Sequence, residues 1–244
     1  MKPNPKRPIS KGIRPAFTLV ELLVVIAIIT ILMAAGAASI SGVAGKGVTS
    51  AVETAEALFD EARVIAQGKN LRSAVLVAKK MTNSPADDLR RIIVVHEKTK
   101  TDGTADDPNS PNPKWVVTSR GAVLPDQVFF SQEFSRKNHS NSSGSLDTVS
   151  KTDIDGVKKA YEGDYYIYKF TPQGLIDPGL QGASFVVGSG VRNSAQPADS
   201  QPPKAVKGSL KDFGGFVIWR NGSTSRFRSP AQIGADKLSA GSKF

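Results

Sequence analysis

The distribution of apolar residues divides the chain into three parts with different periodicities. The first is an uninterrupted apolar run at residues 17–40, in which Glu21 is the one charged residue. At a rise of about 1.5 Å per residue, a helix of this length spans the hydrocarbon core of a bilayer. The pattern therefore predicts the transmembrane half of a helix, which we place at residues 17–44.

The second part, residues 45–70, has the pattern of an amphipathic helix. Gly68 and Asn70 supply a stop signal at its end. The first two parts together predict one helix of about 75 Å, in which the glycine-rich stretch 36–47 is the easiest to unwind. The apolar stripe of the second half recurs at spacings of three and four, at Val48, Val52, Ala55, Phe59, Ala62 and Ala66.

The third part, residues 71–244, changes to short β-like runs. The polar segments 98–114, 131–160 and 192–212 have the composition of surface loops. Asn221-Gly222 is a signal for a type I′ hairpin. The expected fold class is α+β, with a long N-terminal helix packed on an antiparallel β-sheet domain. Strands are predicted at residues 73–78, 91–96, 115–118, 127–130, 165–170, 184–187, 216–220 and 225–228.

The charge distribution orients the apolar run across the membrane. Residues 1–16 contain five of the 32 basic residues and no acidic residue. The positive-inside rule places this end in the cytoplasm and the β-rich domain on the other side of the membrane. A cleavable secretory signal with its cut among the small residues 34–39 is the alternative interpretation.

The start of the apolar run carries a specific motif. Phe17-Thr18-Leu19-Val20-Glu21-Leu22, behind a basic leader, resembles the cleavage and methylation site of type IV prepilins and type II secretion pseudopilins. The resemblance implies that prepilin peptidase removes residues 1–16, cutting between Ala16 and Phe17, and that Phe17 is N-methylated. It also implies an assembly role for Phe17 and Glu21, in which the terminal ammonium of one subunit meets the carboxylate of another. Ala16 stands where the family usually has glycine.

The order of features after the helix is similar to that of H-type minor pseudopilins. The similarity rests on a strand led by Trp115, the segments 120–125 and 170–174, and a C-terminal hairpin with Gly222 at its turn. It implies a pilin-like fold and a minor structural subunit of a type II secretion or type IV pilus-type filament. Such a subunit would sit in the bacterial inner membrane, with its globular domain in the periplasm and sibling pilins as partners.

The residues give little support to an enzyme. The chain has no cysteine and two histidines, His96 at a strand end and His139 in a polar loop, and it has no phosphate-binding or nucleophile motif. Residues 153–156 read Asp-Ile-Asp-Gly, a weak match to a calcium loop that lacks the later glutamate. We therefore expect no cofactor, and calcium is the alternative that this segment keeps open.

A second function class rests on positive charge. A filament-tip protein could capture an anionic partner such as DNA through basic residues after residue 190. Prolines flank this cluster and no aromatic run accompanies it, which favours a solvated basic loop, so we do not expect nucleic acid as a partner. The cluster consists of Arg192, Lys204, Lys207 and Lys211.

Overall fold

The computed structural model describes most of the chain. Residues 31–40 and 43–46 are described in their backbone only. The described ranges are residues 19–40, 43–101, 103–107, 110, 113–140, 143–180, 182–207, 212–234 and 239–244.

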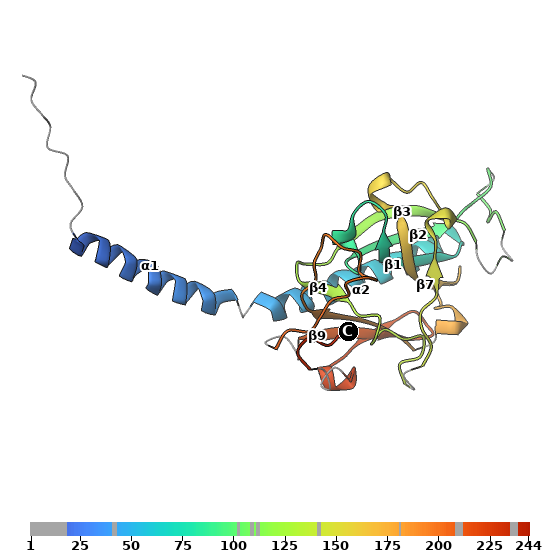
Figure 1. Cartoon of the computed structure of the whole chain (residues 1–244). Coiled ribbons are helices and arrows are strands. Elements are labelled where there is room, and N and C mark those ends of the chain that lie inside the picture. Colours follow the sequence, from blue (N-terminus) through green and yellow to red (C-terminus); the bar gives the residue numbers. More distant parts are fainter. Residues whose placement is uncertain are drawn as a thin grey trace, which may run out of the picture. The chain divides into compact units, whose positions relative to one another are not determined.

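The chain divides into two compact units, residues 1–41 and 42–244. The first unit contains helix α1, Leu19–Ile40, and the second begins with helix α2, Val43–Lys69 (Figure 1). Residues 41 and 42 lie outside the described part, so the continuity of the predicted long helix is not tested. The predicted leader, residues 1–16, also lies outside it.

The described residues of the second unit form two β-sheets, where the sequence predicted antiparallel sheet without this division. One has six strands in the order β5-β7-β1-β2-β3-β6, and the other has four in the order β10-β9-β8-β4. All pairs are antiparallel except β3 with β6, which is parallel. The strands are β1 Ser73–Met81, β2 Arg91–Glu97, β3 Trp115–Val123, β4 Val128–Phe130, β5 Thr148–Val149, β6 Ile154–Asp155, β7 Gly163–Phe170, β8 Ala183–Ser189, β9 Phe213–Ile218 and β10 Thr224–Arg226.

All eight predicted strands are present, and the two that were not predicted, β5 and β6, have two residues each. Strands this short carry too few residues for a recognisable alternation. Single turns of 3-10 helix connect several elements, at Pro85–Asp87, Lys151–Asp153, Lys159–Tyr161, Pro178–Leu180 and Pro230–Gln232.

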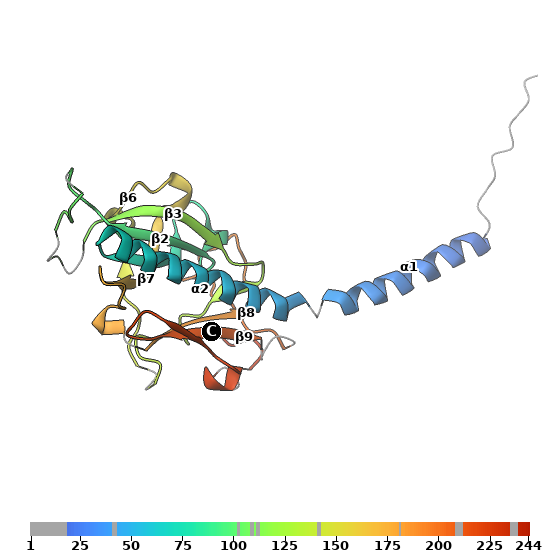
Figure 2. The ribbon, with the colours of Figure 1, turned by 180° about the vertical axis from the view of Figure 1, so that it is seen from behind.

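Helix α2 packs against both sheets, contacting β1 and β2 of the larger sheet and β8 and β9 of the smaller one (Figure 2). All six residues of the predicted stripe are buried, which confirms the helical period. Asn70 follows the helix with a φ of 53°, the left-handed conformation typical of a helix end. Phe59 lies at the centre of the interface, with its ring centroid 5.1 Å from that of Tyr168 in β7 and 5.2 Å from that of Phe216 in β9.

The six-stranded sheet is buried on both faces, and part of the segment 131–160, which was predicted as a surface loop, covers one of them. One face packs on α2, and the other carries a second apolar cluster. Residues of the polar segment cover that cluster: Val149 is 8% exposed and Ile154 is 6% exposed. A few apolar side chains from this segment are enough to cover the face, because most of the apolar side chains in the cluster belong to the strands of the sheet.

The segment 192–212 is also not a simple surface loop. Ala198 and Ala205 are 2% and 3% exposed and belong to the main core. The segment 98–114 is held by Arg72, whose guanidinium donates to the carbonyl oxygens of Ser110 and Asp107 at 2.5 and 2.9 Å. The contacts of these two segments are made by alanine side chains and by backbone carbonyls. The amino-acid composition of the segments therefore did not predict them.

The hairpin between β9 and β10 is confirmed, but the predicted type I′ turn is wrong. The Trp219 amide donates to the Ser223 carbonyl at 2.9 Å, and the Gly222 amide donates to the Trp219 carbonyl at 2.8 Å. Among residues 219–223, a positive φ occurs at Gly222 alone, at 76°. A type I′ turn needs two such residues, whereas a type I turn followed by one left-handed residue matches this three-residue loop.

Gly121 in β3 gives a prediction for stability. Its φ is +60°, and a Cβ added there would lie 1.7 Å from the carbonyl oxygen of Ile92 in β2. We expect Gly121→Ala to lower the free energy of unfolding by about 1–3 kcal/mol, because the strained backbone and the neighbouring strand must both adjust. Urea denaturation followed by tryptophan fluorescence measures this, since both tryptophans lie in residues 42–244.

Gly68→Ala is the matched control. Gly68 lies near the end of α2, and a Cβ there meets no atom within 4 Å. The control variant should gain about 0.5–1 kcal/mol, since alanine favours the helix more than glycine does. Equal stabilities for the two variants would contradict the prediction.

Candidate functional site

Over residues 19–30, helix α1 presents a mainly apolar surface on every side. Residues 19–30 are all exposed, and the large apolar side chains among them have exposed fractions from 43% to 80%. Covering a valine, leucine or isoleucine side chain stabilises by about 1.5–3 kcal/mol, so this surface favours lipid or other protein over water. Within the described part of the chain, no helix is both long and apolar enough to cross a membrane.

The predicted assembly carboxylate lies at the beginning of this helix. Glu21 is in the first turn of α1 and is exposed among apolar neighbours. A negative charge in the first turn interacts favourably with the helix dipole. Ala16 and Phe17, the predicted cleavage, methylation and assembly residues, lie outside the described residues, so the geometry between Phe17 and Glu21 is not tested.

The predicted basic cluster after residue 190 does not form one solvated surface. The side chain of Arg192 is 0% exposed. Lys204 and Lys207 are exposed, and Lys211 lies outside the described residues. The interpretation of this cluster as a solvated basic loop is therefore wrong for Arg192, which is part of the folded interior.

Arg192 and Asp88 form the centre of a buried polar network. Nη1 of Arg192 lies 3.7 Å from Oδ2 of Asp88, and both side chains are 0% exposed. Asp88 accepts hydrogen bonds from the amides of Met81 at 2.7 Å and Ala198 at 2.8 Å. Nη2 of Arg192 donates to the carbonyl oxygen of Pro85 at 2.5 Å. The network therefore joins residues after 190 to the connection between β1 and β2.

Burial has opposite effects on the two charged groups of this network. Desolvation raises the pKa of Asp88 above its usual value, although its two amide donors and Arg192 act in the other direction. Desolvation also lowers the pKa of Arg192, against the attraction of Asp88. Burial therefore disfavours the charged form of each group relative to water, and the hydrogen bonds offset part of this desolvation cost.

Both histidines contact other side chains within the fold. Nε2 of His96 lies 3.3 Å from Nζ of Lys69, and its Nδ1 lies 2.5 Å from the hydroxyl of Thr118. Burial, and then the charge of Lys69, lower the pKa of His96. The ring of His139 packs on that of Phe227, with centroids 4.7 Å apart.

The segment considered for calcium has its carboxylates in ion pairs. Asp153 pairs with Lys114 and Asp155 pairs with Lys98, each at 2.7 Å. In the described ranges, no group of three or more His, Cys, Asp or Glu side chains could hold a metal ion. Calcium binding at residues 153–156 stays an untested alternative to the expectation of no cofactor.

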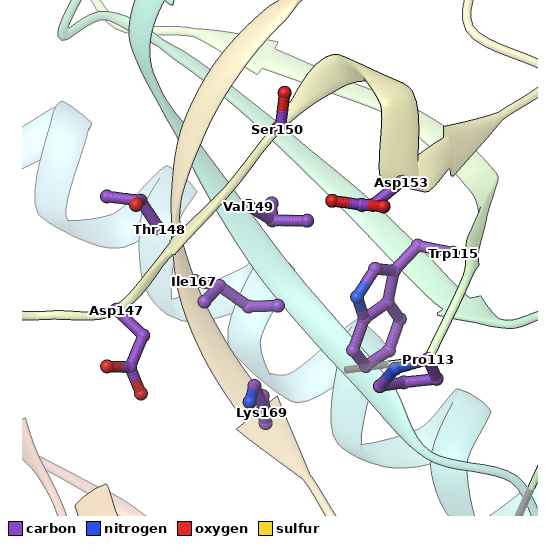
Figure 3. Close-up of a pocket in the computed structure, with 9 residues that line it drawn as sticks. All are labelled: Pro113, Trp115, Asp147, Thr148, Val149, Ser150, Asp153, Ile167 and Lys169. Carbon is purple, nitrogen blue, oxygen red and sulfur yellow. The ribbon is translucent and has the colours of Figure 1, made fainter. Parts of the chain in front are cut away.

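A polar groove of 760 Å³ lies against the six-stranded sheet, and no sequence pattern predicted it. In Figure 3 the indole of Trp115 lies on one side of it and Asp147 on the other. Asp147 pairs with Lys137 at 2.6 Å, and Asp153 has its own lysine partner. The lining residues are Pro113, Trp115, Asp147, Thr148, Val149, Ser150, Asp153, Ile167 and Lys169. Its acidic groups are thus engaged within the fold.

Comparisons with known proteins place a specific motif at the N-terminus. Residues 14–37 match the family model described as the prokaryotic N-terminal methylation motif. This confirms the motif that the sequence predicted around Phe17 and Glu21. The curated proteins gave no match. Among solved structures, the type IV minor pilin FimU of Pseudomonas aeruginosa is similar, with 12% identity, a TM-score of 0.35, and coverage of 75% of this chain and 93% of FimU.

Proposed function

We propose that this protein is a minor pilin-like subunit, which assembles through its N-terminal helix into a filament of the type II secretion or type IV pilus kind. Residues 17–44 would insert in the inner membrane, with the β-rich unit on the periplasmic side. Prepilin peptidase and sibling subunits would be its partners. The match of residues 14–37 to the N-terminal methylation motif carries the proposal.

The chemistry of α1 supports this function. A helix that is apolar on all sides and exposed over residues 19–30 needs a covering environment. A bilayer supplies that environment before assembly, and the helices of neighbouring subunits supply it in a filament. The carboxylate of Glu21 is the exception in this surface, which points to a specific task.

That task is the recognition of a neighbouring subunit. After cleavage the chain would begin with the ammonium group of Phe17, and methylation keeps its positive charge. In hydrocarbon, this ammonium and the Glu21 carboxylate of a neighbour each offset the cost of burying the other. Their pairing would fix the axial register of two helices, after which the apolar surfaces pack.

Cleavage between Ala16 and Phe17 is the first test. The protein extracted from membranes should begin at Phe17, as determined by intact mass and N-terminal sequencing. Ala16→Leu should leave the leader attached to most of the chains, because the family's peptidase cuts after a small residue.

Ala38→Leu is the matched control for this experiment. It puts the same side chain at the position where an ordinary secretory signal would be cut. Cleavage should remain at Phe17 in this variant. A mature chain that begins after Ala38, and its loss in Ala38→Leu, would refute the proposed function.

A further inference from the structure

A second pocket, formed by residues 191–204 and Lys243, is positively charged. Its volume is 480 Å³, and three of its lining residues are basic while none is acidic. The lining residues are Val191, Arg192, Asn193, Ser200, Gln201, Pro202, Lys204 and Lys243. We call it the Lys204/Lys243 pocket.

The backbone holds two of these cations next to each other. Lys204 pairs in antiparallel bridges with Val191 on one side and Lys243 on the other. Two like charges directly opposite each other in such a bridge destabilise it. Among the described residues, neither lysine forms an ion pair with a carboxylate. The fold therefore places the two lysines directly opposite each other, without a described counter-charge.

The third cation is Arg192, and its hydrogen bonds are incomplete. Nη1 donates to the carbonyl oxygen of Gln196 at 2.8 Å and Nη2 to that of Pro85, but Nε is buried and has no acceptor in the described part of the chain. A buried donor without an acceptor costs about 1–3 kcal/mol. Asp88 supplies the negative charge next to this guanidinium, at 3.7 Å from Nη1, but it does not accept a hydrogen bond from Nε.

We propose that the Lys204/Lys243 pocket binds a phosphate group, either as inorganic phosphate or as the phosphomonoester of a larger ligand. A dianion between the two ammonium groups would remove their repulsion. Its several oxygens could also accept hydrogen bonds from polar neighbours such as Ser200, whereas the completely buried guanidinium of Arg192 acts through its charge alone.

The shape of the site favours one phosphate group over a nucleic acid. Binding to a DNA backbone needs a row of cations that contacts many successive phosphates. Here two exposed cations, Lys204 and Lys243, line a single pocket, and the third, Arg192, has a completely buried side chain. Asn193 and Gln201 add side-chain amides, which can donate to a phosphate or to the hydroxyl groups of a sugar.

Calorimetric titration of the full chain in detergent with sodium phosphate, at an ionic strength matched with sodium chloride, tests the proposal. The wild type should bind one phosphate per chain. Lys204→Gln combined with Lys243→Gln should weaken binding about tenfold or more, since two charge-assisted contacts are lost. The matched control, Lys158→Gln with Lys159→Gln, removes two exposed charges elsewhere and should stay within about twofold of the wild type.

Thermal unfolding separates a binding defect from a folding defect. Without phosphate, the Lys204/Lys243 double variant should unfold at the same temperature as the wild type or a higher one, because repulsion has been removed. Added phosphate should raise the unfolding temperature of the wild type and the control, and not that of this variant. A variant that unfolds at a lower temperature without phosphate would contradict the repulsion on which the proposal depends.

Further ligands identify the source of the phosphate. Glycerol 3-phosphate that binds more tightly than inorganic phosphate would support a phosphomonoester on a larger ligand, and the reverse order would support the free ion. The proposal is overturned if the wild type binds neither, or if the Lys204/Lys243 double variant binds them unchanged. Tight, salt-sensitive binding of a short DNA duplex that the double variant retains would overturn it as well.

Discussion

Glu21→Gln is expected to abolish assembly of this protein with its partner subunits while its processing and folding continue. Glutamine keeps the size of the side chain and one acceptor oxygen, and it removes the charge. In lipid, an ammonium group without its carboxylate partner costs about 3–5 kcal/mol, which corresponds to a loss of more than about 100-fold in association.

The structure separates this effect from folding. Glu21 belongs to the unit of residues 1–41, and the described apolar clusters of the other unit contain no residue before Val48. Membrane insertion should become easier, because a carboxylate in an apolar helix costs about 2.5–3.5 kcal/mol on insertion scales. Cross-linking to sibling subunits in the membrane measures assembly, and intact mass measures processing.

Thr30→Val is the control within the same helix. The Thr30 hydroxyl donates to the carbonyl oxygen of Ala27 at 2.8 Å, so this polar group is satisfied inside α1. Its replacement should leave cross-linking unchanged. Normal cross-linking in both Glu21→Gln and Glu21→Ala would refute the assembly role. An uncleaved leader in these variants would assign Glu21 to the peptidase contact instead.

Phe59→Ala is expected to cause the largest loss of stability in the β-rich unit, about 3–5 kcal/mol. Phe59 is 1% exposed and lies where α2 meets both sheets. Its truncation removes a ring that contacts aromatic side chains on three strands and leaves a cavity between the sheets. These partners are Tyr168 and Phe170 in β7, Phe185 in β8 and Phe216 in β9, with centroids 5.1 to 6.3 Å away.

Val64→Ala provides the control on the opposite side of the same helix. Val64 is 65% exposed, so its truncation should change the free energy of unfolding by less than about 0.5 kcal/mol. Urea denaturation with tryptophan fluorescence gives both values. A loss of less than about 1 kcal/mol in Phe59→Ala would mean that the two sheets are not joined through this ring.

The elements that were predicted correctly are determined by residues that lie close together in the sequence. The stripe from Val48 to Ala66 has the helical period, and a helix fixes which of its residues share a face, so all six were buried as predicted. Asn70 ends the helix for an equally local reason, since asparagine tolerates the left-handed conformation. The motif around Phe17 and Glu21 is likewise contiguous and could be recognised without a fold.

The tertiary structure decided how these elements are combined. Alternation along a strand does not specify its partner, so the division into two sheets and the parallel pair of β3 with β6 were not predictable. The turn at Asn221-Gly222 was misassigned because the pairing of Trp219 with Ser223 sets the loop length. Residues 131–160 have the composition of a solvent-exposed loop, and the sheet face that some of them cover is formed by strands elsewhere in the sequence. Their own composition therefore did not indicate that they are in contact with it.

The same distinction separates the two candidate sites. Phe17 and Glu21 are four positions apart in the chain, and the sequence alone identified them. The Lys204/Lys243 pocket brings together residues as far apart in the chain as Val191 and Lys243, and its buried arginine lies beside a carboxylate at residue 88. Composition reports that Arg192 is charged, but whether that charge is solvated depends on which distant backbone groups surround it, and only the folded chain determines this.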